Sequence, residues 1–323
     1  MGCVGLRLDT KADETSPMAL PQAYPTKPVR LIEPFGLGGG PDLLGRALAR
    51  KLAELWGQPV TVENVTGAGA TAGPAQVATS PADGYTLLIN TNAQAYSAAF
   101  SRNLSYDPLN DFVPIVALSR QPYVLVASRL AGVTSVSELV ALAKAKPGEL
   151  KFGSTGIGTA THIGVEKFNL AAGIVAIHAP PGPSDSNATT LANAIAGRTT
   201  YYMAPISLVL PQIRDGHLVA LGVSTARRST LLPEVPTIAE AGVPGFDFPI
   251  WYGLWVRAGA PAAVIDTLIR DIGRVLIEPD LRAWIAIHGG EPMSMTQPEF
   301  AHFVLSESES AEQIIKAAGI KPQ

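Results

Sequence analysis

A cluster of four glycines within five positions constrains the fold of this chain more than any other feature: Gly36, Gly38, Gly39 and Gly40. The apolar run before it, at residues 29–35, predicts a short buried strand. The four-residue spacing of the leucines after it predicts a helix that ends near Gly57: Leu44, Leu48, Leu52 and Leu55. At such a helix start, unpaired amides and the helix dipole attract an anion. We therefore predict a concave, donor-rich site at this loop.

The same loop does not match a nucleotide-binding motif. It lacks the G-K-[ST] ending of a phosphate-binding P-loop, and its glycines fit only G-x-G-G rather than G-x-G-x-x-G. A carboxylate ligand agrees better with the pattern, and a glycine loop that merely turns tightly is the structural alternative. Asp42, directly after the loop, is interpreted as a cap of the helix, with a role as ligand to an amine or a metal as the alternative.

Composition bounds the class of protein. The 323 residues suffice for two domains, and 47% hydrophobic residues predict a sizeable core. With 24 basic and 27 acidic residues, the net charge of −3 gives no electrostatic footprint for nucleic acid. The single cysteine, Cys3, allows neither an internal disulfide nor a thiolate metal site. No apolar run reaches the roughly 18 residues of a membrane span.

Motifs for catalysis or metal binding are missing from the sequence. The five histidines show neither H-x-x-x-H nor H-x-H spacing, so we expect no metal site. The nearest approach to a G-x-S-x-G nucleophile elbow, at residues 222–226, ends in alanine. His162 is interpreted as structural, with a general base as the alternative, because no partner acid is visible to orient it. We expect neither a cofactor nor enzymatic activity.

A second loop repeats the opening architecture. Residues 150–154 predict a strand, T-G-I-G-T-A-T at residues 155–161 is a loop rich in glycine and hydroxyl groups, and a helix is expected from about His162. Thr91 and Asn92 follow another predicted strand, at residues 85–90, and are candidates for the same cleft, with ordinary turn chemistry as the equal alternative.

Strands that alternate with helices predict parallel sheets covered on both faces. In such sheets ligands bind beyond the carboxyl ends of the strands, where both loops are placed. Two separate apolar runs are expected at residues 112–118 and 123–127. Capping-box sequences occur at residues 135–138, 237–240 and 296–299.

Eight segments, in order and at close to family spacing, carry a family resemblance. They are Y-P-T-K-P-V-R-L-I from Tyr24, P-F-G-L-G-G-G-P-D from Pro34, G-Q-P-V-T-V-E-N from Gly57 with G-A-G after it, D-G-Y-T-L-L from Asp83, Y-D-P-L-N-D-F from Tyr106, F-G-S-T-G-I-G-T-A-T-H from Phe152 and L-P-E-V-P-T-I-A-E-A-G-V-P-G from Leu232. Together they resemble the solute-binding proteins of tripartite tricarboxylate transporters, the Bug-type family.

The resemblance implies an α/β fold of the type II periplasmic-binding-protein class, with two lobes, two crossovers and a ligand cleft between the lobes. We expect lobe 1 at residues 24–124 and 250–323, lobe 2 at residues 125–249, and residues 1–23 as a tail outside the fold. The expected ligand-binding residues are Phe35, Gly36, Leu37, Gly38 and Gly39 from lobe 1, Ser154, Thr155, Gly156, Gly158, Thr159 and Thr161 from lobe 2, and Thr91, Asn92 and Asp185 at the edges.

The implied function is non-catalytic binding of a small carboxylate, either a mono- or a dicarboxylate and either aliphatic or aromatic. The implied partners are the membrane permease subunits of a tripartite transporter, served by a monomer that closes around the ligand by a hinge motion. Two alternatives stay open: a ligand sensor that docks onto a signalling receptor, and an enzyme on the same fold that acts on a small acid.

The chain departs from the family pattern at three places. H-A-P-P-G-P-S-D-S-N begins at His178, where family members usually carry H-V-P-Y-K-G, so we expect a reshaped pocket edge. Asp185 or Ser184 is a candidate ligand contact there, and a solvated loop acid is the alternative. Leu37 stands where the family often has proline. Residues 1–23 contain no apolar core of an export signal, so the periplasmic location rests on the resemblance and a cytoplasmic one stays open.

Overall fold

The computed structural model describes residues 24–67, 70–100, 104–180 and 187–321. The strands in these ranges are β1 (Val29–Glu33), β2 (Val60–Asn64), β3 (Thr86–Thr91), β4 (Phe112–Ser128), β5 (Lys151–Gly153), β6 (Ile177–Ala179), β7 (Tyr201–Pro205), β8 (Leu218–Val223), β9 (Pro249–Arg257) and β10 (Glu291–Pro292). The α-helices are α1 (Gly40–Trp56), α2 (Ala72–Thr79), α3 (Ala93–Phe100), α4 (Val136–Ala145), α5 (Ala160–Ala172), α6 (Asn187–Ile195), α7 (Ile206–Arg214), α8 (Ala262–Leu276), α9 (Pro279–Ile287) and α10 (Gln297–Ala317).

The strands form one mixed sheet in the order β2-β1-β3-β9-β4-β7-β5-β6, with β8 and β10 also paired to β4. β1 pairs in parallel with β2 and β3, and β5 pairs in parallel with β6 and β7. β9 and β4, however, are antiparallel to each other and to their outer neighbours β3 and β7. The predicted parallel pairing is found within each of the two outer groups, but the sheet as a whole is mixed, because β4 and β9 carry the chain across and back between these groups.

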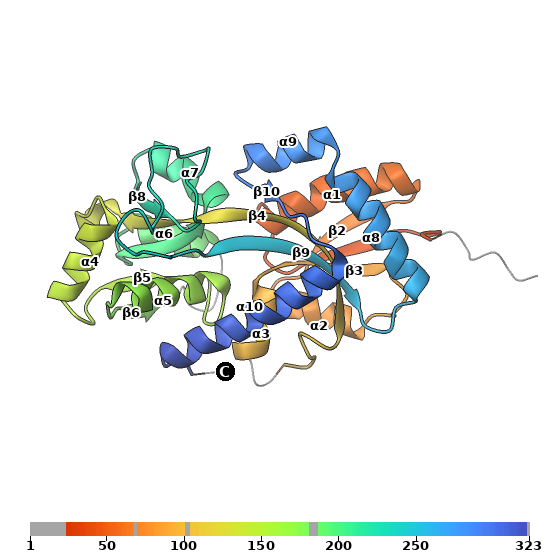
Figure 1. Cartoon of the computed structure of the whole chain (residues 1–323), viewed down its shortest axis with the longest axis horizontal. Coiled ribbons are helices and arrows are strands. Elements are labelled where there is room, and N and C mark those ends of the chain that lie inside the picture. The colour runs from red at the N-terminus through yellow and green to blue at the C-terminus, as the bar shows by residue number, and fades with distance from the viewer. Residues whose placement is uncertain (1–23, 68–69, 101–103, 181–186, 322–323) are drawn as a thin grey trace, which may run out of the picture.

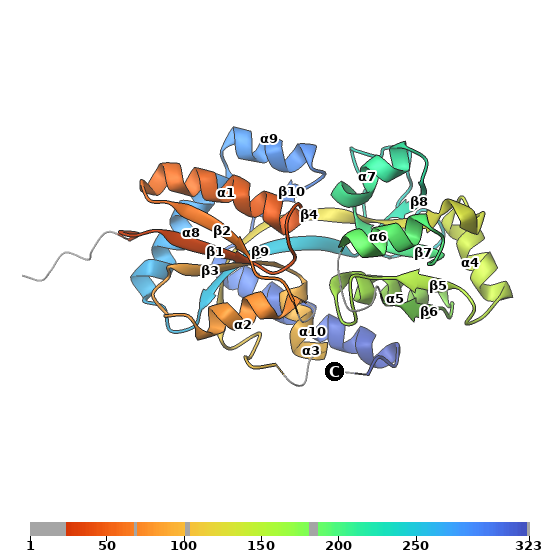
Figure 2. The same ribbon diagram turned by 180° about the vertical axis from the view of Figure 1, so that it is seen from behind.

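β4 is a single strand of 17 residues rather than two separate runs. Its first part, through Pro122, pairs with β9, and its last part, from Tyr123, pairs with β7 and β8. Figures 1 and 2 show β4 and β9 passing side by side across the middle of the molecule, between a group of elements at each end. The partner exchange within β4 marks the passage from one group to the other.

Helices cover both sides of the β2-β1-β3-β9 region. α1, α8 and α9 lie together on one side, and α2, α3 and α10 lie on the other (Figure 1). Trp251 and Trp255 of β9 are almost fully buried and meet the ring of Phe300 of α10, with ring centroids 5.8 and 5.5 Å away. The Trp251 indole also donates to the carboxylate of Glu307 at 2.9 Å. These contacts fix the C-terminal helix α10 to the sheet.

Two of the three capping-box sequences begin a helix. α4 starts after Ser135, whose hydroxyl accepts from the Glu138 amide, and α10 starts with a full capping box at Thr296. Thr237 and Glu240 also exchange two hydrogen bonds, at 2.8 and 3.0 Å, but only turns follow them. No pattern in the sequence indicates α3, because its residues lack an apolar period.

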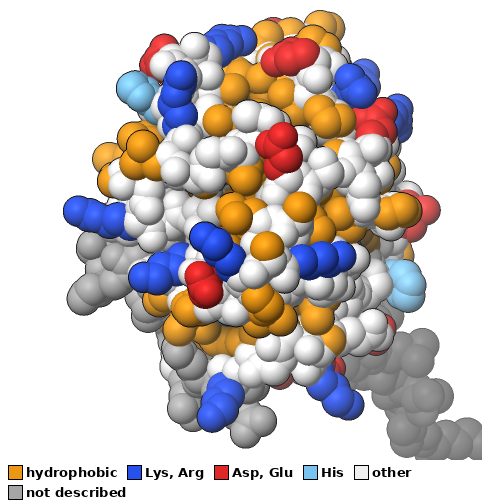
Figure 3. Space-filling model, turned by 90° about the vertical axis from the view of Figure 1, so that its left-hand side faces the viewer, with side chains coloured by type: hydrophobic (Ala, Val, Ile, Leu, Met, Phe, Trp, Pro, Cys, Tyr) orange, Lys and Arg blue, Asp and Glu red, His pale blue; other side chains and the backbone are white. Residues whose placement is uncertain are grey.

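None of the helices in the described part of the chain has the length and apolarity to cross a bilayer. At the end of the molecule that carries α4, basic and acidic side chains are scattered among apolar ones (Figure 3). This face therefore shows no patch of a single charge sign, as the nearly balanced composition leads us to expect.

Candidate functional site

Two carboxyl groups bind the backbone amides of the β1–α1 loop and fix its shape. The Glu33 carboxylate accepts hydrogen bonds from the amides of Phe35 and Gly36, both at 2.9 Å. The Asp42 carboxylate accepts from the Gly38 amide at 2.9 Å. The strand therefore ends, and the helix begins, with an acid that binds the glycine loop between them.

Asn64 on β2 links these two acids, because its Nδ2 donates to Glu33 at 2.7 Å and to Asp42 at 2.9 Å. Burial raises the pKa of Glu33 to about 7, against the smaller opposing effect of its hydrogen bonds. Burial acts in the same direction on Asp42, but the Arg46 guanidinium at 2.9 Å and the N–H donors outweigh it and hold the pKa of Asp42 below its usual value. Asp42 is thus ionised at neutral pH, whereas burial favours the neutral form of Glu33 more than in an exposed glutamate.

The β5–α5 loop is held by hydroxyl groups instead of carboxylates. The Ser154 hydroxyl accepts from the Gly156 amide at 3.1 Å and donates to the carbonyl of the same residue at 3.0 Å. Thr161 Oγ1 accepts from the Thr155 amide at 2.9 Å, and the Thr159 hydroxyl donates to the Gly156 carbonyl at 2.7 Å. These uncharged bonds close the loop on itself.

The two loops have the same backbone course. Gly38 and Gly158 each precede the N-cap of the following helix, with φ of 78° and 77°. The N-caps are Gly39 (φ −73°, ψ 164°) and Thr159 (φ −69°, ψ 161°). The positive φ explains why both loops need glycine at the position before the N-cap. The sequence analysis predicted the repeated strand–loop–helix architecture, and this geometry confirms it.

His162, the third residue of α5, is part of a buried ring stack. Its Nδ1 accepts from the Gly158 amide at 3.1 Å, so in the neutral ring Nε2 carries the proton. Its ring stacks on His178 at 3.9 Å, and Phe152 stacks on both. Burial lowers the pKa of His162 to about 3 and that of His178 to about 4, so both rings are neutral at pH 7. His178 Nε2 also lies 2.6 Å from Ser154 Oγ.

Amides without an acceptor lie at the two helix starts. Within the described residues, the N–H groups of Gly39, Gly40 and Ala160 donate to no protein atom. The amides of Phe35, Gly36 and Gly38, and those of Thr155, Gly156 and Gly158, are already bonded within their loops. Glu33 and Asp42 thus occupy three amides of the first loop, and the amides of Gly39 and Gly40, at the start of α1, are the ones left without an acceptor among the described residues.

The remaining predicted residues are placed less centrally. Thr91 and Asn92 are buried at the start of α3, where Thr91 Oγ1 accepts from the Ala93 amide at 3.1 Å. This bond is the turn chemistry weighed as the alternative for Thr91. Leu37 is 80% exposed at the tip of its loop. Asp185 lies outside the described residues.

Both helix starts are packed against an aromatic ring from a distant segment. A Cβ atom at Gly40 would overlap the hydroxyl group of Tyr252 on β9. A Cβ atom at Gly158 would overlap the ring of Phe100, the last residue of α3. The β5–α5 loop therefore touches the group of elements that contains the β1–α1 loop.

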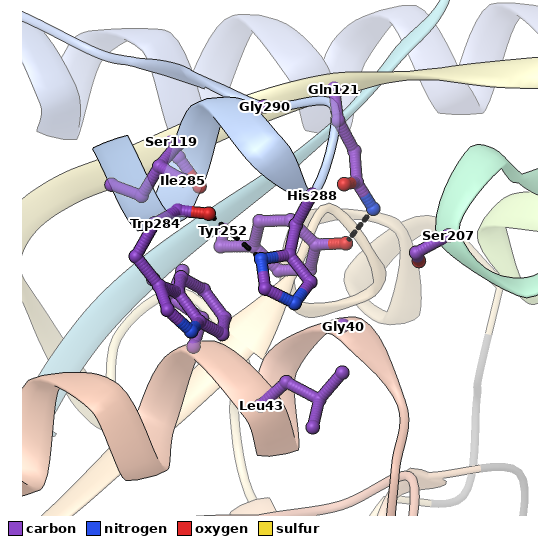
Figure 4. A pocket seen from close by; sticks show the side chains of 11 residues that line it. Gly40, Leu43, Ser119, Gln121, Ser207, Tyr252, Trp284, Ile285, His288 and Gly290 are labelled. Carbon is purple, nitrogen blue, oxygen red and sulfur yellow. Dashed lines mark hydrogen bonds between the residues drawn. The ribbon is translucent and has the colours of Figure 1, made fainter. Parts of the chain in front are cut away.

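A small pocket of about 20 Å³, with space for about one water molecule, adjoins the start of α1. Figure 4 shows the Gln121 side chain bonded to the Tyr252 hydroxyl, the His288 ring above Gly40, and Ser207 of α7 facing them across the pocket. Segments from both groups of elements that β4 and β9 connect thus meet at the N-terminus of α1.

Sequence reasoning missed Glu33, His178 and Tyr252 as parts of this site. Glu33 had a local signal, since it is an acid at the end of an apolar strand directly before a glycine loop. The stacking of His178 on His162 and the contact of Tyr252 with Gly40 join residues far apart in the chain, and local patterns carry no sign of them.

Comparison with known proteins gives a consistent result. The profile described as "Tripartite tricarboxylate transporter family receptor" matches residues 44–320. Protein BugT of Bordetella pertussis is 33% identical over 300 residues, which cover 92% of this chain and 91% of that protein. A protein of Pseudomonas sp. (strain P51), described as a UPF0065 protein in the tcbD-tcbE intergenic region, is 32% identical over 299 residues, which cover 91% of this chain and 87% of that protein.

Solved structures agree with this grouping. The R. palustris protein Rpa4515 with adipate superposes with a TM-score of 0.86 at 31% identity, over 93% of this chain and 100% of that one. MatC (Rpa3494) from Rhodopseudomonas palustris with bound malate gives 0.81 at 26% identity, over 90% of this chain and 100% of that one. These relatives are solute-binding receptors rather than enzymes, and the predicted two-lobed α/β fold is confirmed. The chain belongs to the tripartite tricarboxylate transporter receptor family.

Proposed function

We propose that this chain binds a small mono- or dicarboxylate between the β1–α1 and β5–α5 loops and delivers it to the permease subunits of a tripartite tricarboxylate transporter. Adipate and malate are the acids named for the related structures, and they set the size of ligand that the proposal includes. As for periplasmic members of the family, we place this binding step in the periplasm.

The observation that carries the proposal is the matched pair of helix starts. Each loop bends with the same glycine geometry and ends with free amides, at Gly39 and Gly40 in one unit and at Ala160 in the other. The start of an α-helix carries roughly half a positive charge. Two such starts suit a carboxylate without a buried arginine. Among the described residues, Arg46 is the one cation that contacts either loop or the start of the helix after it, and it is already paired with Asp42.

We further propose lobe boundaries at residues 124/125 and 249/250, with residues 24–124 and 250–323 in lobe 1. The change of partner within β4, from β9 to β7 at Tyr123, supports the first boundary. The contact of Phe100 with Gly158 supports closure of the two lobes on each other at the ligand loops. In this proposal the lobes open by a hinge motion to admit the acid.

A thermal-shift and calorimetry screen tests the proposal. The probes are adipate, malate and benzoate, with adipamide as a neutral analogue of adipate and agmatine as a cation without a carboxylate. At 100 times its dissociation constant, a ligand stabilises the folded protein by about 2.7 kcal/mol. We expect at least one acid to give such a shift and adipamide to give none. Absence of a shift with every acid, or a response to agmatine alone, would overturn the proposal.

A backbone substitution tests the role of the amides directly. Ala160→Pro removes the N–H group at the first position of α5, where proline is well tolerated. The preceding residue, Thr159, already has the extended ψ of 161° that a following proline requires. Loss of one hydrogen bond to a charged group costs about 1.5–3 kcal/mol, so we expect roughly 10- to 100-fold weaker binding of the acid.

The matched control is Ala262→Pro, which makes the same change at the first residue of α8. Ala262 is exposed and α8 packs beside α1 and α9, away from the β5–α5 loop. We expect this variant to bind the acid as the parent protein does. Equal affinity of the Ala160→Pro variant and the parent would show that the α5 amide does not contact the ligand.

A further inference from the structure

Glu33 is a buried acid beneath the β1–α1 loop, and the proposed function leaves it without a role. Its exposure is 0%, and its two oxygens are bonded to the amides of Phe35 and Gly36 and to Asn64 Nδ2. Within the described residues, no lysine or arginine side chain contacts this carboxyl group. A buried carboxylate that has no counter-charge favours its neutral form.

The nearest charge is that of Asp42 on α1, which shares the donor Nδ2 of Asn64 with Glu33. The two acids differ in their counter-charge: Arg46 lies 2.9 Å from Asp42, whereas no cation in the described part of the chain contacts Glu33. Asp42 raises the pKa of Glu33 further, after burial and against the hydrogen bonds to Asn64 and the two amides. Of this linked pair, Glu33 is the member that takes up a proton.

Two other strands carry titratable groups that adjoin Glu33 in the sheet or interact with its charge. On β2, Glu63 is the next titratable group, and its charge is neutralised by Arg30 at 2.6 Å. On β9, burial and the charge of Glu33 raise the pKa of Tyr252, so its phenol is neutral. The hydroxyl of Tyr252 lies directly over Gly40, whose amide is one of the proposed ligand donors. Glu33 thus acts electrostatically on the helix start at which the ligand is placed.

We propose that Glu33 takes up a proton when a carboxylate binds at the start of α1, and that this residue sets how much negative charge the ligand can carry. The inference rests on the proposed carboxylate function. A bound anion adds a further negative charge beside Asp42 and Glu33. Asp42 stays ionised beside Arg46, so the added repulsion is relieved by protonation of Glu33.

The coupling operates near neutral pH, because burial already places the pKa of Glu33 at about 7 without a ligand. Each acid molecule bound near pH 7 therefore draws a fraction of a proton from solution. Above pH 7 the affinity falls with increasing pH, toward tenfold per pH unit. The fall is steeper for a dianion such as malate or adipate than for a monoanion such as acetate.

Isothermal titration calorimetry of the full chain tests the proposal. Adipate, malate and acetate are titrated from pH 6.5 to pH 8.5, where the acids themselves are almost fully ionised, in pairs of buffers with different ionisation enthalpies, so that proton uptake by the protein is read directly. We expect uptake with the parent protein and none with Glu33→Gln, whose affinity for the acids stays constant over the same pH range. The control is Glu63→Gln, which removes an equal charge from β2 and keeps the pH dependence.

A second measurement is independent of any ligand. Carbon-13 NMR of the glutamate carboxyl groups, with Glu33 assigned by its loss in Glu33→Gln, follows its titration in the unliganded protein. A midpoint near 7 supports the proposal, and a midpoint near 4.5 overturns it. Binding that is equally pH-dependent in the parent and in Glu33→Gln overturns the coupling and leaves the proposed function intact. Absence of binding by all three acids at pH 6.5, the lower end of this range, counts against the proposed function itself.

Discussion

Asp42 and His162 are structural equivalents: each is the third residue of the helix that follows a glycine loop, and each accepts a hydrogen bond from a loop glycine. The distances are 2.9 Å from the Gly38 amide and 3.1 Å from the Gly158 amide. One acceptor is an ionised acid and the other is a neutral imidazole. The α5 start therefore keeps the full attraction of its dipole for an anion, whereas Asp42 partly cancels that of α1.

This difference leads to a prediction about charge at position 162. His162→Asn keeps an acceptor for the Gly158 amide, and His162→Asp keeps the acceptor but adds a negative charge. A unit charge about 6 Å from a bound carboxylate costs on the order of 2–3 kcal/mol at an effective dielectric constant of 20. We expect His162→Asp to bind adipate at least tenfold more weakly than His162→Asn, by calorimetry at pH 7. Equal affinities would place the ligand away from the α5 start.

A pair of glycine substitutions separates backbone strain from lobe contact. Gly38 and Gly158 have nearly the same φ, so alanine at either position costs about 1–2 kcal/mol of strain. A Cβ at Gly38 meets nothing within 4 Å, whereas one at Gly158 overlaps Phe100. We expect Gly158→Ala alone to displace Phe100 and open the molecule, seen as a larger radius of gyration by X-ray scattering. If both variants keep the parent radius, Phe100 does not hold the lobes together.

The histidine stack predicts a loss of stability in acid. The pKa values of His162 and His178 are lowered to about 3 and about 4, so unfolding binds protons below the ordinary histidine value of 6.5. This stability is fully present above pH 6.5 and decreases as the pH falls toward 3. At pH 5 the loss is about 2 kcal/mol for His162 and less for the more exposed His178.

Urea unfolding at pH 7 and pH 5 measures this loss. We expect His162→Asn to reduce the difference between the two pH values. The control His217→Asn, at an exposed position, keeps the parent difference. The Glu33→Gln variant, with both histidines unchanged, is measured in the same way, because the opposite effect of Glu33 is removed there. Equal stability of this variant at pH 7 and pH 5 would contradict the neutral buried stack.

Glu33 predicts a pH dependence of stability with the opposite sign. Its folded pKa of about 7 lies above the ordinary 4.5, so the folded state binds the proton more tightly than the unfolded state does. The stabilisation is fully present below pH 4.5 and is lost as the pH rises through 7. It amounts to about 3 kcal/mol at most. Urea unfolding gives the free energy of unfolding of the parent and of Glu33→Gln. We expect the difference, parent minus variant, to decrease between pH 5 and pH 8. A constant difference would show that Glu33 titrates normally.

Elements set by local patterns were predictable from the sequence, and those set by distant partners were not. The leucine period of α1 and the capping box at Thr296 gave helices where the patterns placed them. The Thr237 box has the same local bonds but no helix, because a left-handed Gly242 (φ 112°) turns the chain away. The polar residues around Arg120 predict two separate apolar runs in β4, yet the strand continues through Arg120, which pairs with β10 and β9.

The parts of the candidate site also differ in whether the sequence predicts them. The positive φ at Gly38 and Gly158 is a local property, and the glycine pattern predicted both loops. Which amides remain free depends on side chains that the fold brings in. Asn64 joins Glu33 to Asp42 from a neighbouring strand, and no local sequence pattern predicts that contact. The identity of the family came from the resemblance of eight segments, rather than from any single motif.

Ser224 ties together the two crossings between the groups of elements. Its hydroxyl accepts from the Tyr123 amide at 3.0 Å and donates to the Phe248 carbonyl at 2.6 Å, and its exposure is 0%. The rings of Tyr123 and Phe248 also stack, with centroids 5.8 Å apart. Both residues lie beside the proposed lobe boundaries. The buried hydroxyl is therefore placed to hold the two crossing segments in one relative position.

We expect Ser224→Ala to destabilise the protein by about 1–3 kcal/mol, because it removes the partner of a buried donor and a buried acceptor at once. Ser306→Ala, which deletes an exposed hydroxyl on α10, should change the free energy of unfolding by less than about 0.5 kcal/mol. Urea unfolding of both variants measures the two costs. Because closure depends on the geometry of the crossings, Ser224→Ala should also weaken adipate binding, whereas Ser306→Ala should not. A Ser224→Ala variant as stable as Ser306→Ala would mean that the crossings are held by the ring stack and backbone pairing alone.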